Sequence, residues 1–256
     1  MSLLGRLARK VLRTVGDVPT VDVFSDLDRL LSGRKVRTVL DVGACFGEYS
    51  LRFARRWPEA RVIAFEPNPE TFEQLQTAVK GDPQVQTVPL GAFSKSGTRS
   101  FFLNSWAGAC SLLDRPQRGP AYHSPRAVHV DQTEVPVVRL DEWAAEQGLD
   151  GEIDLLKLDI QGAELEALKG AEALLPRVGC ILSEVHFYAN YEGACLLDEL
   201  WAYLRSQGFT LYQLYSEWGA RDGQLVQGDA LFIRDDIRTE RLGTNGKPFQ
   251  AVKFHL

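Results

Sequence analysis

The residues with the clearest chemistry follow the first predicted strand. The segment DVGACFG, residues 41–47, covers the end of the predicted strand at residues 38–42 and the turn that follows it. In an open parallel sheet, ligands bind beyond the carboxyl ends of the strands, and the first strand–helix turn is the usual nucleotide site. Glycines at such a turn let the backbone approach a ligand closely. We therefore expect Gly43, Ala44 and Gly47 to line a cofactor site.

The residues around this turn indicate which cofactor it suits. The spacing G-x-x-x-G lacks the central glycine that a dinucleotide pyrophosphate needs. Asp41 would repel a phosphate, but it suits the ammonium group of an amino acid. Glu66, about twenty residues further on at the end of the second predicted strand, is placed to accept hydrogen bonds from both ribose hydroxyls, and Pro67 beside it belongs to the same expected site. S-adenosylmethionine joins an amino acid to a nucleoside, so the pattern predicts this cofactor, although a lone glycine turn is often only structural.

Two further groups of polar residues end predicted strands. Asp159 follows the strand at residues 153–158, and Glu184 and His186 end the strand at residues 180–185. Because side chains alternate along a strand, Glu184 and His186 share one face. Asp159, Glu184 and His186 are candidates for the base that removes a proton from a substrate hydroxyl, and His186 is the best matched to neutral pH.

Other interpretations of these polar residues stay open. Asp159 and Gln161 also suit the cap of the next predicted helix. Lys157, inside the strand, needs a carboxylate partner if it is buried, for which Glu164 and Asp159 are available. Asp159, Glu184 and His186 together offer ligands for a divalent cation that would acidify a bound hydroxyl, but the sequence contains no tight ligand motif.

Alternating strands and helices position these residues. Predicted strands at residues 38–42, 61–65, 85–90, 153–158 and 180–185 are separated by helical patterns, except after the third. Such alternation predicts a mainly parallel sheet covered by helices on both faces. The strands at residues 209–214 and 229–233 have no helix between them, so we expect an antiparallel edge hairpin.

One insertion interrupts this alternation. Residues 98–103 and 134–138 read as an inserted antiparallel pair, joined by a long loop at residues 104–133 that contains Trp106, Tyr122 and His123, aromatic residues suited to stacking on a sugar. We divide the chain into an N-terminal helical extension (1–36), one α/β domain (37–235, with the insertion at 98–138) and a C-terminal tail (236–256).

Composition excludes several classes of protein. The 256 residues suit one large domain, and a net charge of −5 gives no support for nucleic-acid binding. Four scattered cysteines without a CxxC pair predict free thiols and a cytoplasmic location. No apolar run approaches the roughly 20 residues of a transmembrane helix. Residues 3–15 form a basic amphipathic pattern, which we expect to pack on the domain or to form a homodimer, with weak peripheral membrane contact as the alternative.

Several segments together resemble one enzyme family. They are DVGACFGEYS, AFEPNPETFEQL, LKLDIQGAELEALKGA, ILSEVHFY and GDALFI, in that order between about residues 37 and 234. They resemble the FkbM-type methyltransferases. The resemblance implies a Rossmann-like class I methyltransferase sheet of seven mostly parallel strands with an antiparallel edge hairpin. It also implies O-methylation of a hydroxyl on a sugar, a glycolipid or a polyketide-type natural product, so a small molecule or glycan is the expected acceptor.

The resemblance also assigns roles to positions. Asp41, Gly43 and Gly47 match the turn that binds the methionine part of the cofactor, and Glu66 matches the ribose acid. Ala92 matches a residue beside the adenine, and Asp159 matches the acid near the reacting centre. Cys45 stands where the family commonly has asparagine, so a polar contact from that side chain is not carried over.

The expected reaction is in-line transfer of the sulfonium methyl group to an oxygen atom. Two alternatives are an NAD(P)-dependent oxidoreductase and a non-catalytic cofactor-binding protein of the same Rossmann-like type. The missing central glycine argues against the first, and the polar cluster at the sheet edge argues against the second. Methylation of a flipped nucleic-acid base is not expected, because no Asn/Asp-Pro-Pro-aromatic tetrad follows the fourth strand of the parallel sheet.

Overall fold

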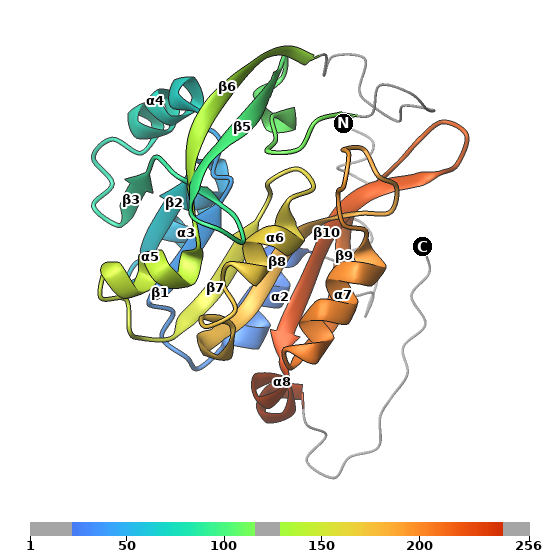
Figure 1. Cartoon of the computed structure of the whole chain (residues 1–256). Helices are drawn as coiled ribbons and strands as arrows, with labels where there is room; N and C mark the ends of the chain where they lie inside the picture. The colour runs from blue at the N-terminus through green and yellow to red at the C-terminus, as the bar shows by residue number, and fades with distance from the viewer. Residues whose placement is uncertain (1–21, 116–128, 243–256) are drawn as a thin grey trace, which may run out of the picture.

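A seven-stranded sheet forms the centre of the molecule (Figure 1). The computed structural model describes residues 22–115 and 129–242. The strands lie in the order β3-β2-β1-β7-β8-β10-β9. Their bounds are β1 Thr38–Val42, β2 Arg61–Phe65, β3 Val85–Val88, β7 Ile153–Leu158, β8 Val178–His186, β9 Phe209–Gly219 and β10 Leu225–Arg234. All neighbours pair in parallel except β10, which runs antiparallel to β8 and β9. The predicted sheet and its reversed hairpin are confirmed, with β9 as the edge strand.

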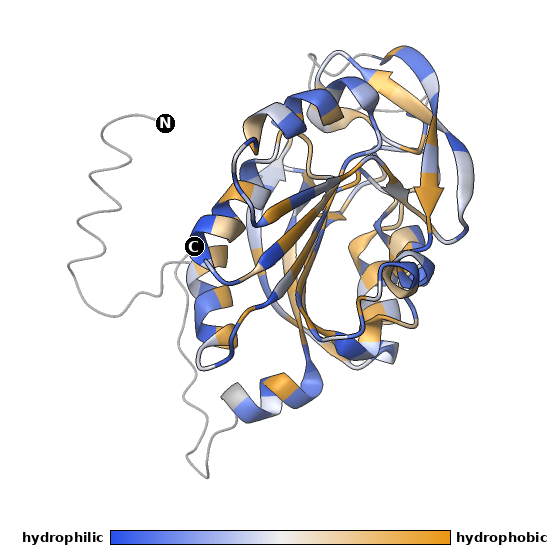
Figure 2. Cartoon of the chain, turned by 90° about the vertical axis from the view of Figure 1, so that its left-hand side faces the viewer, coloured by the Kyte–Doolittle hydropathy of each residue, from blue (hydrophilic) through white to orange (hydrophobic). Residues whose placement is uncertain are grey.

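Helices cover both faces of this sheet. They are α2 Val23–Leu31, α3 Glu48–Arg56, α4 Pro69–Ala78, α5 Leu140–Glu146, α6 Glu164–Lys169, α7 Leu197–Ser206 and α8 Asp235–Leu242. Buried side chains of α5, α6 and α7 pack in one core cluster with Leu40 and Ile63 of the sheet. Residues of α2, α3 and α8 pack in a second cluster with Val39 and Val62, which point to the opposite face. The apolar strands between two layers of amphipathic helices are visible in Figure 2.

Burial on both faces explains the composition of the central strands. Every residue of β1 and β7 is buried, and such strands are usually apolar throughout. The polar exceptions are Thr38, Asp41, Asp154 and Lys157. Two of them matter for the strand ends, Asp41 of β1 and Lys157 of β7. They are direct partners in the register of the two parallel strands, so their side chains lie side by side on one face. This pairing places two opposite charges next to each other at the carboxyl end of the sheet.

The insertion forms a small second sheet above the main one. Its strands are β4 Gly91–Ala92, β5 Gly97–Asn104 and β6 His129–Val138, in the order β4-β6-β5. The antiparallel β5–β6 pair is confirmed, but β6 begins at His129, well before the predicted residue 134. The early residues of β6 are mostly polar and mostly exposed, so backbone pairing with β5 defines them and hydrophobic alternation does not. β4 has only two residues, too few for a sequence pattern.

Other predicted bounds also change. The helical pattern between the predicted strands at residues 153–158 and 180–185 gives only the short helix α6, because the chain turns at Gly170, where a Cβ atom would lie 2.1 Å from the carbonyl oxygen of Phe93. A short 3-10 helix, Leu175–Arg177, then leads into β8. The C-terminal tail predicted from residue 236 instead contains most of α8, whose Ile237 is buried against the sheet. The division of the chain into three parts remains a prediction.

Two predictions made from composition can be compared with the residues that the structure describes. All four cysteines carry free thiols, as expected. In the part of the chain that the structure describes, no helix has the length and apolar character needed to cross a membrane. The predictions for residues 3–15 and for Tyr122 and His123 lie outside the described residues.

Candidate active site

A cavity of about 390 Å³ opens at the carboxyl ends of the parallel strands, beneath the small second sheet. Its walls come from the turns after β1, β2 and β7, from the end of β8 and from the insertion. Seven of the residues predicted for the site line it: Gly43, Ala44, Glu66, Pro67, Ala92, Asp159 and Glu184. Three others, Asp41, Gly47 and His186, are not part of its lining.

The two glycines of the turn after β1 have different structural roles. Gly43 has φ +81°, and a Cβ atom there would lie 1.9 Å from the carbonyl oxygen of Asp159. Only glycine lets the β1 turn pack this closely against the end of β7. Gly47 also has a positive φ, +80°, but a side chain there would meet Leu75 of α4. Gly47 therefore serves the packing of α3 on α4, whereas Gly43 shapes the cavity wall.

Glu66 lies at the end of β2 with both carboxylate oxygens held by the backbone. One oxygen accepts a hydrogen bond from the amide of Cys45 at 3.0 Å, and the other accepts one from Asn68 at 3.0 Å. Burial raises the pKa of Glu66 to about 7, although these two hydrogen bonds oppose the rise. A carboxylate oxygen has more than one acceptor position, so Glu66 can still accept hydrogen bonds from a ligand in the cavity.

Asp41 and Lys157 form a buried ion pair at the cavity wall. Their charged atoms lie 3.1 Å apart, and Asp41 also accepts a hydrogen bond from the hydroxyl of Ser50 at 2.6 Å. Lys157 lines the cavity and lies 3.7 Å from the carboxylate of Asp159. Burial lowers the pKa of Lys157, but the charges of Asp41 and Asp159 outweigh it and raise the pKa overall. Of the two partners predicted for Lys157, Asp159 is confirmed and Glu164 is wrong; the closest partner, Asp41, was not predicted.

A hydrogen-bonded network connects the polar residues at the other end of the cavity. The side-chain amide of Gln161 donates to Asp159 at 3.0 Å and to Glu184 at 2.9 Å. Its carbonyl oxygen accepts a hydrogen bond from the hydroxyl of Tyr191 at 2.8 Å. Gln227 of β10 donates to the second oxygen of Glu184 at 3.0 Å. Gln161 thus orients both cavity-lining acids.

Sequence reasoning missed parts of this network. The sequence places Gln161 at the ligand-binding edge of the sheet, with a helix cap as the alternative, but it does not predict the hydrogen bonds to Asp159 and Glu184. In the structure Gln161 has φ +58° and lines the cavity. Tyr191 and Gln227 come from a loop and an antiparallel strand that only the folded chain brings near Asp159, so no local signal marks them.

Burial raises the pKa of Glu184 to about 7, and the nearby charge of Asp159 adds to the rise.

His186 is placed behind this network. Its side chain is fully buried and lies 3.4 Å from Glu184, which confirms that the two residues share one face of β8. The imidazole does not reach the cavity lining, so Asp159 and Glu184 are better placed than His186 to contact a substrate.

The rim of the cavity is aromatic and comes partly from the insertion. Trp106 lines the cavity and is 55% exposed, and Phe46 of the β1 turn is 43% exposed. A side chain at Gly108 would meet the Trp106 ring at 3.0 Å, so this glycine makes room for the indole. An exposed flat ring at the mouth of a cavity is suited to stacking on a ring-shaped ligand.

Comparison with known proteins agrees with this geometry. Residues 41–211, more than half of the chain, match the model of the methyltransferase FkbM domain. The methyltransferase sdnD of Sordaria araneosa is 28% identical over 205 residues, which cover 70% of this chain and 76% of sdnD.

The names of two further relatives state either the position that is methylated or the acceptor. The 2-O-methyltransferase NoeI of Sinorhizobium fredii is 27% identical over 60% of this chain and 65% of its own length. The hexuronic acid methyltransferase AglP of Haloferax volcanii is 28% identical over 57% of this chain and 54% of its own length. The match to the family model, together with the sheet order and the cavity, shows that this chain belongs to the FkbM family and is an S-adenosylmethionine-dependent methyltransferase.

Proposed function

We propose that the protein transfers the methyl group of S-adenosylmethionine to a hydroxyl oxygen of a sugar or a similar small hydroxylated molecule. The observation that carries this proposal is that the two ends of one cavity hold different acidic side chains, each suited to a different part of the reaction. Glu66 lies at its nucleoside end, and the linked acids Asp159 and Glu184 lie at its other end. This arrangement suits a cofactor bound along the strand ends, with its methyl group presented to an acceptor at the acids.

The cavity offers a partner for each part of the cofactor. The carboxylate of Glu66 suits the two ribose hydroxyls. Pro67 and Ala92, with Leu90 and Gly91 between them, form an apolar wall for the adenine. The Lys157 ammonium group suits the carboxylate of the methionine part. Asp41 is neutralised by Lys157, so we assign it the role of holding Lys157 in place instead of direct contact with the cofactor ammonium.

The chemistry requires little covalent help from the protein. The acceptor oxygen attacks the methyl carbon, the carbon–sulfur bond breaks, and the bonding pair stays on sulfur to give S-adenosylhomocysteine. Alignment of oxygen, carbon and sulfur supplies much of the acceleration, up to about 7–11 kcal/mol. The hydroxyl proton goes to a carboxylate. We assign this role to Asp159, because its side chain lines the cavity and is 38% exposed, whereas the side chain of Glu184 is buried.

Two independent features support a sugar as the acceptor. NoeI is named as a 2-O-methyltransferase and AglP as a hexuronic acid methyltransferase. The exposed Trp106 ring at the cavity mouth suits the apolar face of a pyranose. Both features favour a sugar over an extended polyketide chain, which a single flat ring would not orient.

A binding and transfer experiment tests the proposal. Calorimetric titrations with S-adenosylmethionine, S-adenosylhomocysteine and NAD should give binding of the first two only. Transfer of a radiolabelled methyl group should then be measured against hexoses, hexuronic acids, short glycans and non-sugar alcohols. We expect labelled methyl ethers of at least one sugar. Labelling of an amine or a carboxylate alone, with no labelling of hydroxyls, would contradict the proposed acceptor class but not the use of the cofactor.

A further inference from the structure

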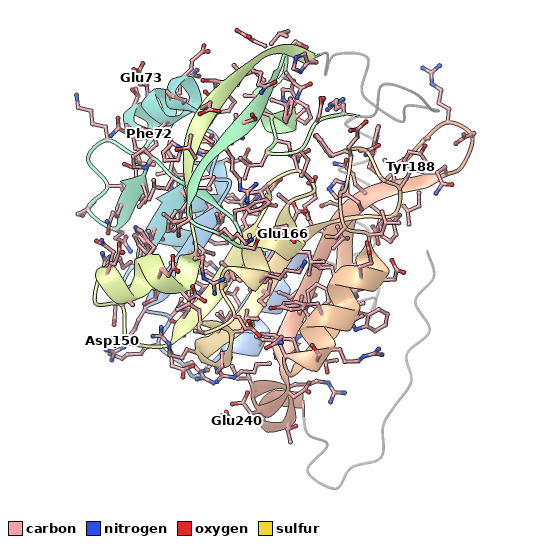
Figure 3. All side chains as sticks on the ribbon, viewed as in Figure 1. Phe72, Glu73, Asp150, Glu166, Tyr188 and Glu240 are labelled. Carbon is pink, nitrogen blue, oxygen red and sulfur yellow. The ribbon has the colours of Figure 1, made fainter. Side chains whose placement is uncertain are left out.

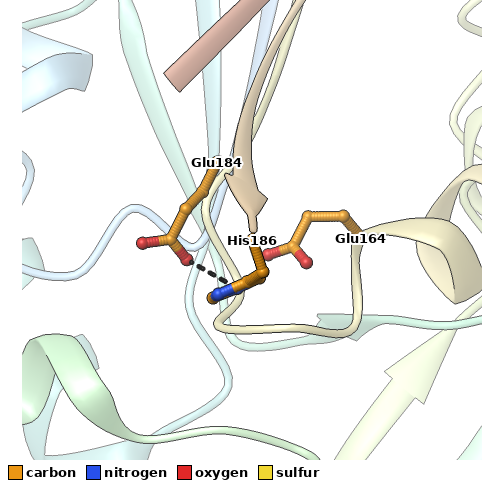
Figure 4. A group of neighbouring side chains, drawn as sticks. All are labelled: Glu164, Glu184 and His186. Carbon is orange, nitrogen blue, oxygen red and sulfur yellow. Dashed lines mark ion pairs between the residues drawn. The ribbon is translucent and has the colours of Figure 1, made fainter. Parts of the chain in front are cut away.

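Beside the cavity lies a compact cluster of which the proposed methyl transfer uses only Glu184. Glu164 of α6 and Glu184 and His186 of β8 are all buried, and one potential ligand atom from each lies within 4.8 Å of the others. Figure 4 shows the two carboxylates reaching toward the imidazole from different elements. Among the described residues, this is the one group of three or more acidic, histidine or cysteine side chains with such spacing.

Two atoms of this cluster lack a partner. One oxygen of Glu164 accepts hydrogen bonds from the amides of Ile160 at 3.1 Å and Gly162 at 3.2 Å. The other oxygen, Oε2, is buried without a hydrogen bond, as is Nδ1 of His186, whereas Nε2 of His186 lies 3.4 Å from Glu184. Buried polar atoms are almost always satisfied in folded proteins, so two orphaned atoms in one cluster indicate a missing partner.

The charge of the cluster indicates that the partner is a cation. Two carboxyl groups and one imidazole lie together in a buried site, where ionised carboxylates are costly unless a counter-charge neutralises them. Lys157, the buried lysine of β7, is already paired with Asp41 and Asp159. Gln161 and Gln227 contribute only neutral donors to Glu184. One divalent cation would neutralise both charges and supply a partner for the orphaned oxygen and for one imidazole nitrogen.

We propose that Glu164, Glu184 and His186 bind a divalent transition-metal cation, such as Zn²⁺ or Mn²⁺, next to the acceptor end of the cavity. The imidazole favours a transition metal over Mg²⁺ or Ca²⁺, which prefer oxygen ligands alone. The site differs from the one expected from the sequence, because Glu164 takes the place of Asp159. Glu184 belongs to both the cluster and the cavity lining, so the ion would fix the position of a cavity wall residue.

The test measures metal binding in the absence of cofactor and acceptor. The full-length protein is treated with a chelator, dialysed and titrated by calorimetry with ZnCl₂, MnCl₂ and MgCl₂. We expect one Zn²⁺ or Mn²⁺ per chain at micromolar affinity or better, and at least tenfold weaker Mg²⁺ binding. The absorption spectrum of Co²⁺ added to the same protein reports whether an imidazole nitrogen is a ligand.

Variants locate the site. Glu164→Gln and His186→Gln should each weaken Zn²⁺ or Mn²⁺ binding by at least tenfold, whereas Glu166→Gln, on the same helix but bonded to Lys169 and Ser94, should not. Circular dichroism and retained S-adenosylhomocysteine binding identify variants that fold. If wild-type protein takes up no stoichiometric Zn²⁺ or Mn²⁺, the cluster is neutralised by protons and the proposal is wrong, whatever the variants do. Equal binding by folded variants would also overturn it. Neither outcome affects the proposed methyl transfer.

Discussion

Glu66 is the residue on which cofactor binding is expected to depend most. Its carboxylate is buried at the end of β2, and its hydrogen bonds to the amides of Cys45 and Asn68 fix its orientation before a ligand arrives. Hydrogen bonds to a charged group contribute about 1.5–3 kcal/mol each. Glu66→Gln should therefore weaken binding of S-adenosylhomocysteine by roughly 10- to 100-fold in calorimetry. Glu73→Gln, an exposed substitution on α4 (Figure 3), is the matched control and should leave the Kd unchanged.

The pKa of Glu66 also predicts a pH dependence. Burial raises this pKa to about 7, so the carboxyl group is largely protonated at pH 6 and largely ionised at pH 8. Only the ionised form accepts hydrogen bonds from both ribose hydroxyls through two free electron pairs. Affinity for S-adenosylhomocysteine should therefore rise with pH through this range in the wild type and stay flat in Glu66→Gln. Parallel profiles for the two proteins would assign the titration to another group.

Asp159 should affect turnover much more than cofactor binding. An amide in its place keeps the shape of the side chain but cannot accept the hydroxyl proton. General-base catalysis contributes about 10²–10⁴-fold, so Asp159→Asn should lower kcat by that range while the Kd for S-adenosylhomocysteine changes only a few-fold. Asp150→Asn, at the opposite edge of the sheet before β7, is the control (Figure 3). A normal kcat in Asp159→Asn would remove this residue from the chemistry.

The sequence identified individual acids better than their partners. Glu66, Asp159 and Glu184 were expected at the site because each ends a predicted strand, and strand ends meet at one edge of a parallel sheet. Lys157 was correctly recognised as a buried lysine in need of an acid. Its main partner, Asp41, depends on the register between β1 and β7, which a single sequence does not contain.

At the scale of elements, the turn after β1 depends on Gly43. Alanine at this position would combine a left-handed backbone with a Cβ atom 1.9 Å from the carbonyl oxygen of Asp159. Gly43→Ala should therefore destabilise the fold by at least about 3 kcal/mol. Gly81 has a similar φ, +89°, but open space around it, so Gly81→Ala should cost only about 1–2 kcal/mol. Urea unfolding measures the loss in free energy of unfolding for both variants. Equal losses would show that the close approach of the β1 turn to the end of β7 adds nothing to the cost of alanine at position 43.

The insertion is the element expected to select the acceptor. Trp106 extends from the segment after β5 to the cavity mouth. Loss of one stacking ring is expected to cost about 1–1.5 kcal/mol. Trp106→Ala should therefore raise the KM for a sugar acceptor about five- to tenfold, with little change in the KM for S-adenosylmethionine. The same rise in both constants would instead indicate a collapsed cavity.

The elements of the insertion were also the hardest to predict. The long strands of the main sheet carry continuous apolar runs that a sequence reveals. β4 is too short for any pattern, and the polar start of β6 is held by backbone pairing with β5. The early end of α6 follows from the approach of Gly170 to Phe93, a contact distant in sequence. Tertiary contacts thus decided the bounds that sequence periodicity did not.

At the scale of the whole molecule, the cavity joins parts of the chain that are far apart. Residues near positions 43, 66, 92, 106, 159 and 184 line it together. The order of elements and the family resemblance predicted the sheet edge at which they meet. The volume of the cavity and the burial of His186 behind it follow only from the packed structure.

Because the ligand would bridge these parts, its binding should stabilise the whole fold. A ligand at 100 times its Kd adds about 2.7 kcal/mol of stability, which corresponds to a rise in Tm of roughly 5–10 °C for a chain of this size. Thermal unfolding with S-adenosylhomocysteine should show this rise, and the same concentration of NAD should produce none. A larger shift with NAD would favour the oxidoreductase alternative.

The most direct test of the account is a crystal structure of the protein with S-adenosylhomocysteine. We expect the ligand in the cavity, with both ribose hydroxyls on Glu66, the carboxylate of the homocysteine part near Lys157, and the sulfur atom facing Asp159 and Glu184. A ligand bound elsewhere, or bound in the cavity with its ribose away from Glu66, would contradict the assignment of this cavity to the cofactor.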